Sequence, residues 1–90
     1  MSKKELSILR NKINKLDEKL FSMIFKRMHI AKKIGKIKVK HNLEITNSFR
    51  ENELIEKVLN LPTNCLDQDE IESIYRLFFS ISKKRQENGK

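Results

Sequence analysis

A hydrophobic repeat through the first 40 residues constrains the fold of this sequence more than any other feature. Its positions alternate in steps of three and four from residue 6 to residue 37, and no proline interrupts them. Such a heptad pattern indicates one amphipathic helix, which we place over residues 4–41. The positions are Leu6, Leu9, Ile13, Leu16, Leu20, Met23, Arg27, Ile30, Ile34 and Ile37.

The expected helix is too long for a compact chain of 90 residues. At about 1.5 Å per residue it spans about 55 Å, whereas a compact protein of this size has a radius of gyration of about 12 Å. These heptad positions form an apolar seam along the helix. Much of this seam must project beyond the rest of the chain, where its apolar side chains need a partner to cover them. A second copy of the chain is the simplest cover, so the sequence predicts a homodimer.

Two shorter helices complete the expected all-α fold, which we treat as a single domain over residues 1–90. The stretch from Ser48 to Glu51 fits the S-x-x-E capping box, so a second helix is predicted to begin there and to end at Pro62. A second cap at Asp67 to Glu70 opens a third helix over about residues 68–87. The predicted apolar faces are Leu54, Ile55, Val58, Leu59 and Leu61 on the second helix, and Ile71, Ile74, Tyr75, Phe78 and Ile81 on the third.

The distribution of charge favours an anionic partner. The formal net charge is +8, and residues 1–40 alone carry 13 Lys and Arg against 3 Asp and Glu, a net charge of +10. A small polyanion, a nucleic acid or a membrane surface would suit this bias. No apolar run approaches the length of a membrane span and the start has no secretory pattern, so we expect a cytoplasmic protein with no membrane partner. Cys65 is the only cysteine, and neither histidine has companions at ligand spacing, so no metal site is expected.

Arg27 is out of place, because it occupies an apolar position of the seam. Ala31, Gly35 and Lys38 follow on the same side of the helix, four, eight and eleven residues later. Two cations therefore flank a strip of small residues, which would leave a hollow for a ligand with two negative groups. The alternative is a bent seam in which Arg27 extends its charged end to solvent.

Other polar residues could join this hollow. Ser82 and Gln86 continue the apolar line of the third helix, where an amide could donate to a ligand oxygen or simply mark a polar helix end. Glu51 follows Arg50 in the first turn of the second helix and could equally be the capping-box acid. Arg10 lies too far along the first helix to meet Arg27 in one chain, but it could reach the hollow of a partner chain if two helices cross antiparallel. No nucleophile–base pair or phosphate loop is recognisable, so any catalysis should rely on positioning and fixed charge.

These residues together resemble the AroQ-type, all-helical chorismate mutases. The resemblance rests on Leu9-Arg10-x-x-Ile13-x-x-Leu16-Asp17-x-x-Leu20, then Arg27-x-x-x-Ala31-x-x-Ile34-Gly35-x-x-Lys38, then Arg50-Glu51 and Ser82-x-x-x-Gln86. Their common order and spacing from Leu6 to Gln86 make it specific. The resemblance implies an intertwined three-helix homodimer that converts chorismate to prephenate, for phenylalanine and tyrosine synthesis, by an intramolecular Claisen rearrangement without a cofactor.

The resemblance also implies roles for individual residues. Arg27 and the partner chain's Arg10 would hold the two carboxylates of chorismate. Lys38 and Gln86 would meet the ether oxygen, and Lys38 would also touch a carboxylate. Glu51 would accept from the ring hydroxyl, while Arg50 and Ser82 would line the site.

The sequence departs from the family at Asn47, where an Asp is common three residues before the Arg-Glu pair. Little changes if this position acts through its backbone, whereas affinity or rate falls if a carboxylate is needed. Two other functions remain open. An isochorismate-pyruvate lyase on the same scaffold would use a similar cationic pocket, and a basic helical protein could bind nucleic acid through the +10 segment, although no recognised nucleic-acid motif is present.

Overall fold

The computed structural model describes residues 2–62 and 64–88, and over these residues it contains three helices and no strand. Helix α1 spans Lys3–Lys40, α2 spans Ser48–Leu59 and α3 spans Gln68–Asn88. The all-α prediction is confirmed, and the long helix begins and ends one residue earlier than the heptad pattern predicted. No helix in the described ranges has a stretch apolar and long enough to cross a membrane.

Local hydrogen bonds define both ends of α1. The Ser2 hydroxyl accepts from the Glu5 backbone N–H at 3.1 Å and caps the N-terminus. At the other end Asn42 adopts a positive φ of 56°, and the Leu43 N–H donates to the Lys38 carbonyl at 2.8 Å. This is the left-handed turn that commonly closes a helix, and asparagine tolerates it better than most residues. The chain therefore reverses direction immediately after Lys40.

The predicted limits of α2 need two corrections. The capping residue is Asn47 and not Ser48, because the Asn47 Oδ1 accepts from the Arg50 backbone N–H at 3.0 Å. The helix also ends at Leu59, since Asn60 is its C-cap and donates its side-chain N–H to the Glu56 carbonyl at 3.0 Å. Leu61 consequently lies outside the helix and is exposed.

The cap of α3 is confirmed. The Glu70 N–H donates to Asp67 Oδ1 at 2.8 Å, and the Asp67 N–H donates to Glu70 Oε1 at 3.0 Å. These reciprocal bonds make a capping box. The predicted apolar face is only partly covered, because Ile71 is buried at 2% exposure whereas Ile74 is 44% exposed.

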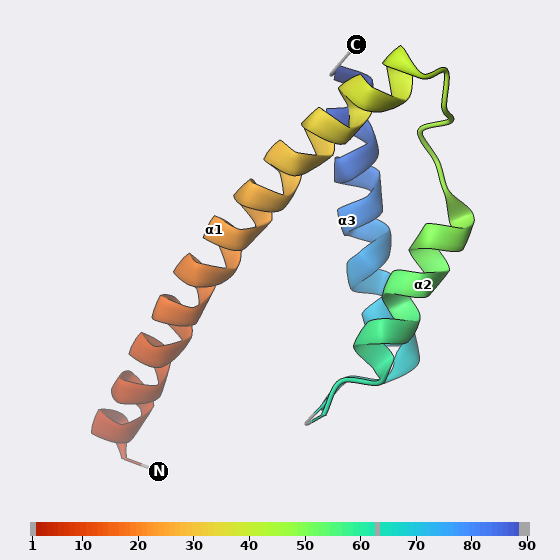
Figure 1. The fold of residues 1–90 in the computed structure, drawn as a ribbon. Coiled ribbons are helices and arrows are strands. Elements are labelled where there is room, and N and C mark those ends of the chain that lie inside the picture. The colour runs from red at the N-terminus through yellow and green to blue at the C-terminus, as the bar shows by residue number, and fades with distance from the viewer. Residues whose placement is uncertain (1, 63, 89–90) are drawn as a thin grey trace.

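The three helices form an elongated body rather than a compact one. Helix α3 packs against both α1 and α2, while the N-terminal half of α1 extends away from the other helices (Figure 1). The radius of gyration is 16.9 Å and the longest dimension is 58 Å. The small core of the single chain contains Met28, Ala31 and Ile71.

The N-terminal half of the apolar seam is left largely uncovered by the described part of the chain. Its six apolar residues are between 39% and 62% exposed: Leu6, Leu9, Ile13, Leu16, Leu20 and Met23. A continuous apolar stripe of this length is unusual on the surface of a folded protein and marks a contact surface. The exposed apolar surface on which the sequence argument for a covering partner depends is therefore present in the folded chain.

Candidate functional site

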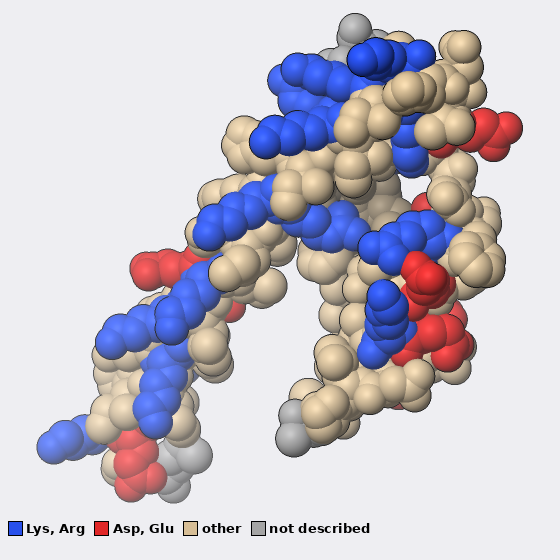
Figure 2. Space-filling model, in the orientation of Figure 1, with Lys and Arg blue, Asp and Glu red and all other residues tan. Residues whose placement is uncertain are grey.

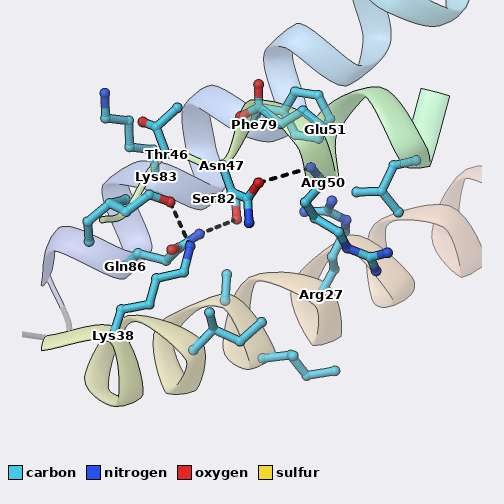
Figure 3. A pocket seen from close by; sticks show the side chains of 15 residues that line it. Arg27, Lys38, Thr46, Asn47, Arg50, Glu51, Phe79, Ser82, Lys83 and Gln86 are labelled. Carbon is cyan, nitrogen blue, oxygen red and sulfur yellow. Dashed lines mark hydrogen bonds between the residues drawn. The ribbon is translucent and has the colours of Figure 1, made fainter. Parts of the chain in front are cut away.

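A cavity of about 450 Å³ lies between the C-terminal half of α1, the connector of residues 41–47, the first turns of α2 and the C-terminal half of α3. Figure 3 shows side chains from all of these segments around it. Seven of the eight site residues predicted from the sequence line this cavity: Arg27, Lys38, Asn47, Arg50, Glu51, Ser82 and Gln86. Segments far apart in the sequence thus meet at one place, which a solvated helix face would not require.

The two cations that flank the strip of small residues, Arg27 and Lys38, differ in how they are held. The Arg27 guanidinium lies 5.7 Å from the centre of the Phe78 ring, a contact that orients the charge without neutralising it. The Lys38 ammonium donates to the Ile45 backbone carbonyl at 2.6 Å, which ties the connector to α1. Within residues 2–62 and 64–88, neither cation forms an ion pair with an acidic side chain. Both charges therefore remain available to an anionic ligand, and the prediction of a hollow with cations is met by the geometry.

Ala31 and Gly35, the small residues between these cations, face different parts of the structure. Ala31 lines the cavity, as the sequence predicted, and is almost fully buried. Gly35 is also buried but does not line the cavity. It faces the backbone of α3 at Gln86 instead. The small size of Gly35 therefore admits a neighbouring helix and not a ligand, which corrects that part of the expectation.

Ser82 and Gln86 are the buried polar pair of the site. Each is only 9% exposed, and the Gln86 Nε2 donates to the Ser82 Oγ at 3.3 Å. The Gln86 Oε1 is buried and has no hydrogen-bond partner among the residues that the structure describes. An unpaired buried amide oxygen costs free energy, so such groups are often found where a ligand or a rearranged side chain completes the bonding. Ser82 and Gln86 are therefore part of the cavity wall and do not merely mark a polar helix end.

Three residues at the start of α2 line the cavity, namely the amide Asn47, the cation Arg50 and the acid Glu51. Because Asn47 caps the helix, Glu51 does not act as the capping-box acid and its half-buried side chain lines the cavity. Arg50 forms an ion pair with Glu53 on the exposed side of the helix. Asparagine and aspartate cap helices about equally well, so the local fold is retained with Asn47 in place of the common aspartate.

The cap makes a direct prediction about stability. Asn47→Ala should lower the free energy of unfolding by about 1 kcal/mol, because an N–H of the first turn loses its acceptor. Asn47→Asp should leave it nearly unchanged. Ser48→Ala is the matched control, and it should cost little because Ser48 is not the cap. Urea unfolding at one fixed protein concentration measures all three, and a larger loss for Ser48→Ala than for Asn47→Ala would contradict this assignment of the cap.

Arg10 is the one predicted site residue that the single chain does not bring to the cavity. It lies on the exposed N-terminal half of α1, whereas the cavity is built on the C-terminal half. This agrees with the expectation that Arg10 and Arg27 cannot serve one site within one chain.

Several lining residues were not predicted as site residues. Thr46, Phe79 and Lys83 complete the wall together with the apolar residues Ile30, Ile34, Ile45 and Leu54. The positions of Phe79 and Lys83, one turn from Ser82 and Gln86 on α3, were a usable signal that the sequence reasoning did not follow. In Figure 3 the Lys83 ammonium points away from Lys38 and Gln86, so its stem rather than its charge borders the cavity.

Comparison with known proteins assigns the family. The model of the chorismate mutase type II family matches residues 9–87, which include every lining residue of the cavity. This chain therefore belongs to the chorismate mutase type II family, as the sequence resemblance indicated.

Individual relatives are larger proteins. The chain is 31% identical over 87 residues to the bifunctional chorismate mutase/prephenate dehydratase of Escherichia coli (strain K12), a match that covers 96% of this chain and 22% of that protein. It is 44% identical over 57 residues to the protein of that name from Aquifex aeolicus, covering 63% of this chain and 16% of the relative. The chain thus spans between about a sixth and a fifth of the length of these curated relatives.

Proposed function

We propose that this chain is a chorismate mutase, an isomerase that converts chorismate to prephenate. The observation that carries the proposal is the convergence of seven residues, which share the family's order and spacing, on one cavity. Two of its cations, Arg27 and Lys38, form no ion pair within residues 2–62 and 64–88. Membership of the chorismate mutase type II family supports it. We also propose that the enzyme acts in the cytoplasm, in the synthesis of phenylalanine and tyrosine.

The reaction breaks an ether C–O bond and forms a C–C bond within one molecule, so no proton or group needs to leave. Catalysis then requires that the flexible dianion be held in its reactive shape and that the charge developing on the ether oxygen be stabilised. Arg27 would bind one carboxylate from its position over the Phe78 ring. Lys38 would touch a carboxylate and also reach the ether oxygen. The apolar wall would exclude water around these charges and strengthen their effect.

Lys38 and Gln86 both retain donors for the ether oxygen. The Lys38 ammonium has three N–H groups and uses one for the Ile45 carbonyl. The Gln86 amide has two N–H groups and uses one for Ser82. Glu51 would accept from the ring hydroxyl, since its carboxylate has no ion-pair partner among the described residues. Asn47, Arg50 and Ser82 would line the cavity beside these residues in supporting roles.

We further propose that two chains form an intertwined homodimer in which Arg10 of the partner subunit binds the second carboxylate. The exposed seam of α1 supports this, because a second antiparallel α1 would cover it and would carry its own Arg10 toward the cavity. Light scattering should give twice the chain mass of 10.7 kDa. Leu16→Lys, in the middle of the exposed seam, should abolish the dimer, whereas Lys15→Glu beside it should not. A stable and active monomer of the unmodified chain would exclude the intertwined arrangement.

The proposed activity is tested by following the loss of chorismate absorbance with purified protein. Isochorismate serves as the control substrate, and released pyruvate is measured in parallel. Consumption of chorismate with formation of prephenate is the expected result. Pyruvate release from isochorismate without chorismate turnover would identify the lyase instead. Salt-dependent binding of DNA or RNA by a protein that turns over neither substrate would identify a nucleic-acid-binding protein.

A further inference from the structure

Helices α1 and α3 approach each other closely at Gly35. A Cβ placed on Gly35 would lie closer than 3.0 Å to three atoms of Gln86, namely its carbonyl oxygen, its Cα and its carbonyl carbon. All three are backbone atoms, so no rotation of a side chain could relieve the contact. Gly35 has no positive φ, and its conformation is open to any residue. The requirement for glycine here is therefore one of space between two helices.

Gln86, whose backbone lies at this contact, also has a side chain that is incompletely hydrogen-bonded. Gln86 is buried and donates to Ser82, and within residues 2–62 and 64–88 its Oε1 has no hydrogen-bond partner. Lys38 follows Gly35 by three residues on α1 and lines the same cavity (Figure 3). The depth at which α3 sits on α1 at Gly35 therefore determines where the Gln86 amide lies relative to the Lys38 ammonium.

We infer that Gly35 is a positioning residue for catalysis, which sets the place of the Gln86 amide through backbone contact between α1 and α3. This inference rests on the proposed function, since it assigns Gly35 a part in that reaction. Gly35 does not touch the cavity and acts only through Gln86. Any side chain at position 35 would push α3 outward at Gln86 and lengthen the reach from its amide to the reacting oxygen.

Gly35→Ala should lower kcat by about tenfold to a hundredfold, as expected when a reacting group is displaced by about 1 Å. KM should change less, because Arg27 lies on α1 away from the displaced end of α3. A double-mutant cycle provides the decisive measurement. If Gly35→Ala acts through Gln86, then adding it to Gln86→Ala should lower kcat by less than about twofold, because the group it displaces is already absent.

The experiment must distinguish a general loss of stability in Gly35→Ala from a displacement of the Gln86 amide. Ile71 is buried on α3 but does not line the cavity, so Ile71→Val and Ile71→Ala give a graded series of destabilised controls. These variants should keep the kcat of the unmodified protein well below their unfolding temperatures. If the Gly35→Ala homodimer does not fold, a heterodimer with one unmodified chain should fold and retain half of the normal turnover, since one of its two sites is undisturbed.

Two results would overturn the inference: a normal kcat in folded Gly35→Ala, or an equal fall in kcat with and without Gln86. An inactive unmodified protein would instead refute the proposed function. In that case the NMR signals of the Gln86 side-chain amide decide the positioning. They should shift in Gly35→Ala and stay in place in Ile71→Val, and unchanged signals in Gly35→Ala would overturn the inference by themselves.

Discussion

Arg27→Ala should lower kcat/KM for chorismate by about a thousandfold or more, which corresponds to about 4 kcal/mol of transition-state stabilisation. The guanidinium is the cation at one end of the cavity, and it lies over Phe78 without an acidic partner in residues 2–62 and 64–88. Without it, a substrate carboxylate would enter a partly apolar cavity unpaired, at a cost of several kcal/mol. Steady-state kinetics on folded protein measure the effect.

Stability should respond to the same substitution much less. The contact with the Phe78 ring contributes about 0.5–1 kcal/mol at an accessible site, and removing a cation from the apolar seam offsets part of that loss. Lys26→Ala is the matched control, because Lys26 is the exposed neighbour on α1 and does not line the cavity. Arg27 would be structural if its removal unfolded the protein yet left turnover per folded site intact.

Basic side chains are spread over a much larger surface than the walls of the cavity, so the test of Arg27→Ala needs Lys26→Ala as its control. Figure 2 shows Lys and Arg along the whole visible face of α1. Only two of the 13 basic residues in residues 1–40, Arg27 and Lys38, line the cavity. The basic bias of the first segment is therefore mostly solvated surface. Arg27 and Lys38 were identified by the helix side that they share with Ala31, and not by net charge.

The long helix could be predicted from the sequence because its signal is repeated. Ten heptad positions each point to the same period, so an irregular one such as Arg27 does not hide the pattern. The predicted ends of α2 each depended on single residues, and both differ from the structure. Asn47 and Ser48 are both good caps, and the choice between them depends on the path of the connector, which Lys38 fixes through Ile45.

The site was predictable in part, for a physical reason that Gly35 and Gln86 illustrate. Residues on one helix share a face by their spacing alone, so Arg27, Ala31 and Lys38 could be grouped from the sequence. How closely α3 approaches α1 depends on tertiary packing, and spacing within one helix carries no information about it. Gly35 consequently looked like a gap for a ligand, whereas the structure fills that gap with the backbone of Gln86.

Arg10→Ala and Lys38→Ala should each be nearly inactive as pure homodimers and should restore activity when they are unfolded together and refolded. The reason is that the proposed site takes Lys38 from one chain and Arg10 from the other. In a mixed dimer one site then collects both substitutions and the other collects neither. Random pairing makes about half of the dimers mixed, each with one intact site of two, so about a quarter of the normal activity should return.

The structure supplies a matched negative control for this experiment. Arg27 and Lys38 line the same cavity of the same chain, so each site in a mixed dimer of Arg27→Ala and Lys38→Ala carries one substitution. That mixture should regain no activity. Simple mixing of Arg10→Ala with Lys38→Ala, without unfolding, should also return little, because intertwined chains separate only when they unfold. If refolded Arg10→Ala and Lys38→Ala stay inactive while mass spectrometry confirms mixed dimers, Arg10 does not cross the interface, and the second carboxylate must be bound by a cation of the chain that supplies Lys38.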